Sequence, residues 1–262
     1  MDKIEWVNLL RRSELDLVIP FLIKRAKILE IGAGTGYQAN ILRELGYNVV
    51  PIDLHSRLHA EYSKLSVVEY DGENIPFPDN NFDVVFSSNV LEHIYNLNKI
   101  QCEIKRVLRP DGLAIHVLPT ASWRFWTSLT NYIYILRLFA NYMGNILFKK
   151  DNSVSPFYEK NEFNNKIGNY GLKRKILRLL IPPVHGERGN VLTEIFYFSR
   201  FFWLPLFKRT GWNVEKYFPN RVLYTDFVAF GPKLSLKKRK TLSFFLGSSC
   251  IIYILKNNGS TK

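Results

Sequence analysis

Three glycines at alternate positions follow an apolar run near the start of the chain, in the sequence KILEIGAGTG from Lys27 to Gly36. Glycine can adopt positive φ, and because it has no Cβ a ligand can lie directly against its backbone. The helical pattern YQANILRELG comes next, so the amides of a helix N-terminus would face such a ligand. The stretch predicts a strand, a ligand-binding glycine loop and a helix, although loops of this kind also bind dinucleotides.

Two acidic residues lie at the ends of the next predicted strands. Asp53 ends YNVVPID, 17 residues past Gly36, where an acid can accept hydrogen bonds from a ribose diol. A helix N-cap or turn is the alternative role for Asp53. Asp71 lies just past the third predicted strand, where its carboxylate could accept from an adenine amino group. A nicotinamide dinucleotide is disfavoured because Tyr37 follows the third glycine, which makes the spacing GxGxG and not GxGxxG.

A polar loop in the second half, PPVHGERGN (182–190), holds candidate catalytic groups. His185 could act as a general base, with Glu187 orienting it and Arg188 holding an anionic part of the substrate. The alternative is a lid hinge in which the histidine only completes a hydrogen bond. His93, in LEHI, is a further catalytic candidate, and a structural role in orienting its loop is the alternative. The two cysteines fit no ligand spacing, and no metal site is predicted.

Strands that alternate with helices must position these groups. Residues 3–25 have apolar positions at helical spacing and a break at Pro20, which predicts one or two helices covering the core. A helix ending at Gly46 and another over 97–109 are expected, with a turn at 110–112 before the fifth strand. The other strands are expected at 28–31, 47–53, 66–69 and 82–87, with helical residues at 90–94. This alternation predicts a parallel, doubly wound sheet.

Charge and aromatic residues are unevenly distributed along the 262 residues. Residues 1–119 have a net charge of −3 and 10 aromatic residues, whereas residues 120–262 have +16 and 28. Two regions with different partners are the simplest explanation. The N-terminus has no secretory pattern and no run reaches the roughly 18 to 20 apolar residues of a spanning helix, so we expect a cytoplasmic protein that could associate with the inner face of a membrane.

Four ordered blocks, ILEIGAGTG, VVPID, EYDGENIPFPDNNFDVVFSSNVLEHI and EIKRVLRPDGLAIHVLP, resemble the class I S-adenosylmethionine-dependent methyltransferases of the type 11-like kind. The resemblance covers about residues 25–119. It implies an α/β, Rossmann-like, seven-stranded and mostly parallel sheet with an antiparallel C-terminal hairpin, for which 211–218 and 248–255 are the candidate strands. It also implies S-adenosyl-L-methionine as the cofactor.

The resemblance carries cofactor-binding roles to eight positions. The methionine part of the cofactor would be surrounded by Glu30, Gly32, Gly34 and Gly36. The ribose hydroxyls would be held by Asp53, and the adenine would be contacted by Asp71 and Gly72. Asn89 would lie near the sulfonium.

The resemblance divides the chain into a core, residues 1–119 and 211–262, and a largely helical insertion, residues 120–210. The insertion is aromatic and basic, and contains SWRFWTSLTNYIYILRLFANYMGNILFKK and GLKRKILRLLIPP. It could form a lid that packs on the substrate pocket, or it could contact a membrane interface or a phosphorylated substrate.

The PPxHGExGN segment, with FSRFFW, LFKRTGW and LGSSCIIYIL, also resembles a bacterial group of methyltransferases associated with polysaccharide and cell-surface glycan synthesis. That resemblance implies O-methylation of a sugar hydroxyl on a nucleotide-linked, lipid-linked or growing glycan. A membrane-associated lipid or quinone methyltransferase remains an alternative. An RNA methyltransferase is disfavoured, because the basic residues are scattered among large apolar ones and no RNA-binding module is visible.

Overall fold

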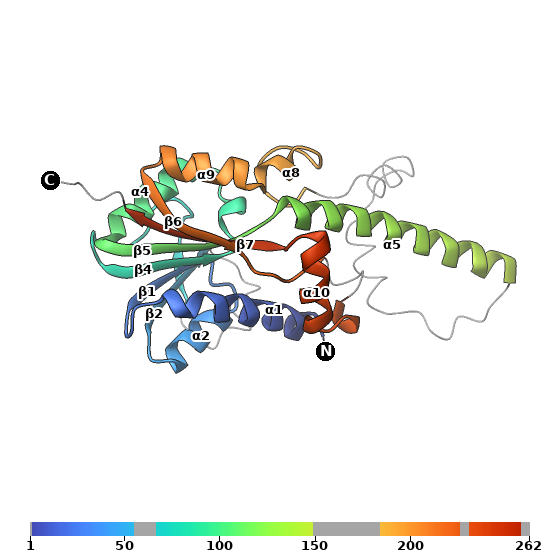
Figure 1. The fold of residues 1–262 in the computed structure, drawn as a ribbon, viewed down its shortest axis with the longest axis horizontal. Helices are drawn as coiled ribbons and strands as arrows, with labels where there is room; N and C mark the ends of the chain where they lie inside the picture. The colour runs from blue at the N-terminus through green and yellow to red at the C-terminus, as the bar shows by residue number, and fades with distance from the viewer. Residues whose placement is uncertain (1, 55–66, 149–183, 226–230, 258–262) are drawn as a thin grey trace.

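A computed structural model of the protein describes residues 2–54, 67–148, 184–225 and 231–257. These residues form a seven-stranded sheet in the order β3-β2-β1-β4-β5-β7-β6 (Figure 1). The first five strands are parallel, and β7 is antiparallel to both β5 and β6. The predicted mostly parallel sheet with an antiparallel C-terminal pair is confirmed. The strands are β1 (Lys27–Ile31), β2 (Asn48–Leu54), β3 (Val68–Tyr70), β4 (Phe82–Ser88), β5 (Leu108–Pro119), β6 (Trp212–Pro219) and β7 (Cys250–Asn257).

Alternation along the buried strands divides the core into two layers. Ile28 packs with α1 (Lys3–Val18) and α2 (Tyr37–Glu44) on one face of the sheet, and its neighbour Leu29 packs with α4 (Leu97–Val107) and α9 (Arg200–Arg209) on the other. Figure 1 shows these two helical layers on either side of the sheet. Both strand residues are 0% exposed, which explains why β1 reads as a continuous apolar run.

The first helices end where the sequence predicts. A capping box between Asp2 and Glu5 starts α1, and the chain continues into the short helix η1 (Ile19–Phe21), which contains Pro20 in its first turn. The helix α2 ends at Glu44, and Gly46 follows with φ +89°. A glycine just past a helix end accommodates this left-handed backbone without strain.

Two boundaries differ from the predictions. The helix α4 ends at Val107, and residues 110–112 lie within β5 and do not form a turn before it. The pairing of β4 with β5 shifts register between Phe82 and Val84, which lets β5 begin early. The LEHI segment forms only the single-turn helix η2 (Leu91–His93).

The antiparallel strands are joined by a long connection. It contains the short helix η3 (Gly231–Lys233) and α10 (Leu236–Leu246), so the predicted hairpin is not a tight one. Both strands pair over most of their predicted residues, with β7 between β5 and β6.

The insertion begins with α5 (Ala121–Phe148), which extends away from the sheet (Figure 1). Its later part contains α8 (Glu194–Tyr197) and α9, whose Trp203, Leu206 and Phe207 are buried against the sheet. The last segment of 120–210 therefore belongs to the core layer. The predicted basic stretch GLKRKILRLLIPP lies outside the described residues. Within the described ranges, no helix combines the length and apolarity needed to cross a membrane.

Candidate active site

The glycine loop connects the carboxyl end of β1 to the first turn of α2. Gly32, Gly34 and Gly36 all have positive φ, at +72°, +55° and +73°. Gly36 is the N-cap of α2, and its amide donates to the Ala33 carbonyl at 2.8 Å. The loop therefore needs glycine for its backbone conformation, as the spacing predicts.

The glycines differ in what surrounds them. A Cβ on Gly32 would lie 2.3 Å from Cγ2 of Val90, whereas a Cβ on Gly34 would have nothing within 4 Å. Gly32 is thus required for packing against the segment after β4. Gly34 faces open space, where a ligand can contact the backbone.

Asp53, near the end of β2, is joined to this loop. Its Oδ2 accepts from the Gly34 amide at 2.6 Å, and its Oδ1 accepts from the Leu54 amide at 2.7 Å. Glu30 is buried in β1 at 2% exposure, and burial together with the Asp53 charge raises its pKa to about 8. Burial therefore favours the protonated form of Glu30, and the carboxylate of Asp53 is the acceptor beside the loop.

Asp71 organises the turn after β3. Its carboxylate accepts from the amides of Glu73 at 2.8 Å and Asn74 at 2.6 Å, and from Asn74 Nδ2 at 2.5 Å. These hydrogen bonds lower the pKa of Asp71 to about 2. The predicted adenine contact must therefore share a carboxylate that already accepts three bonds. A Cβ on Gly72 (φ +84°) would lie 2.9 Å from Cδ2 of Leu54, so Gly72 packs beside β2.

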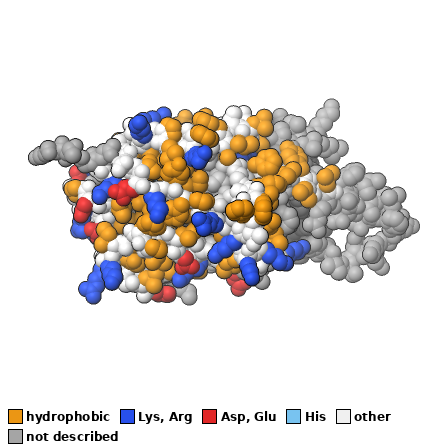
Figure 2. All heavy atoms as spheres, viewed as in Figure 1, with side chains coloured by type: hydrophobic (Ala, Val, Ile, Leu, Met, Phe, Trp, Pro, Cys, Tyr) orange, Lys and Arg blue, Asp and Glu red, His pale blue; other side chains and the backbone are white. Residues whose placement is uncertain are grey.

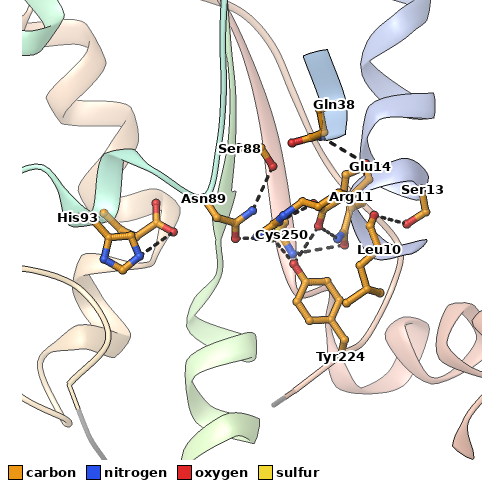
Figure 3. Close-up of polar contacts among 12 residues, drawn as sticks. Leu10, Arg11, Ser13, Glu14, Gln38, Ser88, Asn89, His93, Tyr224 and Cys250 are labelled. Atoms are coloured by element: carbon orange, nitrogen blue, oxygen red, sulfur yellow. Dashed lines mark hydrogen bonds and ion pairs between the residues drawn. The ribbon is translucent and has the colours of Figure 1, made fainter. Parts of the chain in front are cut away.

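Asn89 follows β4 with φ +55°, a left-handed conformation that is uncommon outside glycine. Its Oδ1 accepts from Cys250 Sγ at 3.5 Å, and this sulfur lies 2.9 Å from Tyr224 Oη. Tyr224 in turn donates to Glu14 at 2.8 Å. Figure 3 shows Asn89 between this buried group and His93. The strained backbone and the buried polar contacts hold Asn89 at the end of β4.

The two predicted catalytic histidines lie together although they are far apart in sequence. The ring centroids of His93 and His185 are 4.8 Å apart, and Trp123 of α5 lies 4.6 Å from His185. Burial is the main cause that lowers the pKa of His93, and it lowers that of His185 to about 4. Both imidazoles are neutral at pH 7. Such a low pKa makes His185 a weak general base.

The predicted partners of His185 take other contacts. The Glu187 amide donates to the Glu92 carbonyl at 3.0 Å, and among the described residues no hydrogen bond joins the Glu187 carboxylate to His185. Arg188 donates to the carbonyls of Ile94, at 2.5 Å, and Tyr95. Arg188 therefore attaches the loop to the segment after η2. The sequence instead predicts that Arg188 contacts the substrate.

Glu92 is the carboxylate near both histidines. Its side chain is 0% exposed, its Oε1 lies 3.9 Å from His93 Nε2, and burial raises its pKa to about 8. We did not single out Glu92 from the sequence. The available signal was an acid next to His93 in a segment that follows the end of a parallel strand.

A buried ion pair supports the loop that contains His185. Arg124 Nε of α5 lies 2.8 Å from Glu194 Oε2 of α8, with side-chain exposures of 2% and 0%. The other carboxylate oxygen of Glu194 accepts from the amides of His185 at 2.7 Å and Gly186 at 2.6 Å. The sequence does not reveal this pair, because Arg124 lies in α5 and Glu194 lies in α8, far apart along the chain.

Comparisons with known proteins point to one class of domain. Residues 29–116 match the family model for a methyltransferase domain. An uncharacterized methyltransferase of Mycolicibacterium gilvum is 34% identical over 94 residues, which cover 34% of this chain and 37% of that protein. A probable S-adenosylmethionine-dependent methyltransferase of Mycolicibacterium smegmatis is 29% identical over 96 residues, which cover 35% and 37%.

The alignments span little more than a third of the length of these curated relatives. The crystal structure of an S-adenosylmethionine-dependent methyltransferase from Mesorhizobium loti aligns with a TM-score of 0.53 at 12% identity, over 94% of this chain and 98% of that chain, which shows the shared fold. The matches support the predicted methyltransferase domain with S-adenosylmethionine as its cofactor.

Proposed function

We propose that the protein is an S-adenosylmethionine-dependent methyltransferase that O-methylates a sugar hydroxyl of a bacterial cell-surface glycan or its precursor. The observation that carries the cofactor assignment is the glycine loop, which is open beside Gly34 and joined to Asp53 by a 2.6 Å hydrogen bond. An aspartate at this edge of the sheet is placed to accept the two ribose hydroxyls. The methionine part would lie along the loop, toward Asn89.

Replacing Asp53 by alanine is expected to weaken S-adenosylmethionine binding by about 10- to 100-fold, because hydrogen bonds to a charged acceptor contribute roughly 1.5–3 kcal/mol. Isothermal titration calorimetry measures the affinity, and thermal unfolding checks that the variant is folded. Asp53→Asn keeps an acceptor for the Gly34 amide but loses the charge, so an intermediate affinity is expected. Unchanged affinity in Asp53→Ala would show that Asp53 does not hold the ribose.

The sugar acceptor is proposed from the resemblance that the PPVHGERGN segment carries, and the acceptor site from the position of that segment. Its described residues lie against the segment after β4, through the 3.0 Å hydrogen bond between Glu187 and Glu92. The reaction is an in-line displacement at a sulfonium methyl, so the main requirement is to hold an acceptor oxygen against that carbon. His93 and His185, whose rings are 4.8 Å apart, are the proposed groups to contact such an oxygen.

Transfer of a labelled methyl group onto nucleotide-linked and lipid-linked sugars tests the acceptor class. Label in a sugar ether would support the proposal. Label that enters only phospholipid or quinone extracts would instead support the alternative function, a membrane-associated lipid methyltransferase.

One surface supports an acceptor held at a membrane, whether the acceptor is a lipid-linked sugar or a lipid. We define the α5–α10 surface by its exposed apolar and basic side chains, which are Phe125, Leu129, Tyr132, Phe244, Phe245, Lys237, Lys238 and Lys240. The two helices are joined by Ser122 and Trp126, whose side chains both donate to the Leu246 carbonyl. Figure 2 shows apolar side chains interspersed with Lys and Arg on one face of the molecule. Aromatic rings beside lysines suit the interface of an anionic bilayer.

The double substitution Phe244→Ser and Phe245→Ser is expected to reduce binding to phosphatidylserine-containing vesicles by at least about tenfold, because each buried Phe side chain contributes roughly 1.5–3 kcal/mol. The two rings are 86% and 75% exposed, so the fold should be unaffected. Phe201→Ser on α9, where the ring is 68% exposed on another face, is the matched control. Vesicle sedimentation measures the effect. Equal binding by the unmodified protein, the double variant and the control would show that the α5–α10 surface does not bind the membrane.

A further inference from the structure

Three side chains that can bind a metal converge beside the candidate active site. One ligand atom each from Glu92, His93 and His185 lies within 4.8 Å of the other two. We propose that these residues bind a divalent metal ion, and that zinc serves as its probe. We further propose that the ion activates the acceptor hydroxyl, a role that rests on the methyl transfer proposed above. The sequence predicts no metal site, because its third ligand comes from a distant segment.

Glu92 provides the first independent observation. Its side chain is 0% exposed and lies 3.9 Å from His93 Nε2. Neither carboxylate oxygen has a hydrogen-bond partner in the part of the chain that the structure describes. A buried carboxylate that accepts no hydrogen bond is costly, and a coordinated cation would compensate that cost. Arg11, the cation whose charge acts on Glu92, is paired with Glu14 at 2.8 Å, and Arg124 of α5 is paired with Glu194.

Rigid contacts hold the two ligand-bearing segments together. Glu194 accepts the amides of His185 and Gly186, and the Glu187 amide donates to the Glu92 carbonyl. The Trp123 ring packs edge-on against the His185 ring at 4.6 Å, on the α5 side. A metal site needs such support, because ligands held loosely do not keep coordination geometry.

The ligand set suits zinc or a similar transition-metal ion. Two imidazole nitrogens and one carboxylate oxygen with an open fourth position are typical of catalytic zinc sites. Bonds of about 2.0–2.2 Å would place the ligand atoms roughly 3.4 Å apart, so the side chains must rotate to bring atoms that lie within 4.8 Å of one another up to about 1.4 Å closer. His93 is 42% exposed and is the ligand that would turn, whereas the His185 ring packs against Trp123. The open position then faces the solvent side, from which an acceptor enters.

The ion would act as a Lewis acid. An acceptor hydroxyl bound to it loses its proton to water, and its oxygen forms a bond with the methyl carbon of the cofactor. The bond from that carbon to sulfur breaks, and its electron pair stays on the sulfur as a neutral thioether. No oxidant or reductant is needed.

Zinc titration of the tag-free full-length chain, after treatment with a chelator and dialysis, tests the site by calorimetry. One zinc ion per chain is expected to bind, and Glu92→Gln and His185→Ala are each expected to weaken binding by about 10- to 100-fold or more. Glu215→Gln is the control, since it changes an exposed carboxylate of β6 that pairs with Lys256 and is not one of the three ligands, and its zinc affinity should equal that of the unmodified chain. Cobalt(II) should give visible absorption bands that Glu92→Gln abolishes.

No saturable zinc binding, or binding that all three variants retain equally, would overturn the site. Weakening in Glu215→Gln but not in Glu92→Gln would overturn it as well. Thermal unfolding checks that each variant is folded, and Glu92→Gln, which preserves side-chain shape, is decisive if His185→Ala is unstable. S-adenosylmethionine affinity is measured separately in each protein. An unmodified protein that binds zinc but not S-adenosylmethionine would contradict the proposed function. An unmodified protein that binds S-adenosylmethionine but not zinc would contradict only the metal site.

Discussion

Gly34→Ala is expected to reduce S-adenosylmethionine affinity by about 100-fold or more, which corresponds to at least about 2.7 kcal/mol. The added Cβ would meet no protein atom within 4 Å, so it enters the space where the cofactor would lie against the backbone. The fold should lose only about 1–2 kcal/mol, the cost of placing alanine at φ +55°. Calorimetry measures the affinity and chemical denaturation the stability.

Gly32→Ala is the matched control for this prediction. It adds the same methyl group two residues earlier, but there the new Cβ would lie 2.3 Å from Val90. The left-handed backbone and the overpacking together should cost more stability than Gly34→Ala, by about 1–3 kcal/mol. A Gly34→Ala protein that binds cofactor normally would show that the ligand does not contact this part of the loop.

Glu194→Ala is expected to destabilise the protein by about 3–5 kcal/mol, because it removes one partner of a buried ion pair. The substitution also removes the acceptor of the His185 and Gly186 amides. For a chain of this length the melting temperature should fall by roughly 6–20 °C. Differential scanning calorimetry measures the shift.

Glu215→Ala provides the comparison, since Glu215 pairs with Lys256 at 3.7 Å where the side chains are 40% and 46% exposed. An exposed pair contributes only about 0–1 kcal/mol, so this variant should melt within a few degrees of the unmodified protein. If Glu194→Ala and Glu215→Ala lowered the melting temperature equally, the buried pair would not be what holds the loop. The Glu194→Ala protein should also lose the His93–His185 contact, which histidine NMR shifts would report.

The glycine loop and its flanking elements could be predicted because their signals are local. Ile28, Leu29 and Ile31 are apolar because β1 is buried on both faces, and the glycines after them are required by positive φ. The position of Asp53 near the end of β2 follows from the regular length of a strand–helix–strand unit. The same reasoning misplaced the start of β5, because its early pairing depends on a register shift against β4 that no local pattern encodes.

The sequence by itself determined the parallel sheet, the glycine loop and the acids that accompany it, since each depends on periodicity or on backbone conformation within a few residues. Only the tertiary structure decided which groups surround His185. It brought Glu92 and His93 beside a loop from the second half of the chain, and it used Glu194 and Arg124 to hold that loop. Contacts of this kind depend on how distant segments pack. They are held because separating a buried pair of charges would leave each without compensation, and no linear spacing reveals such a pair.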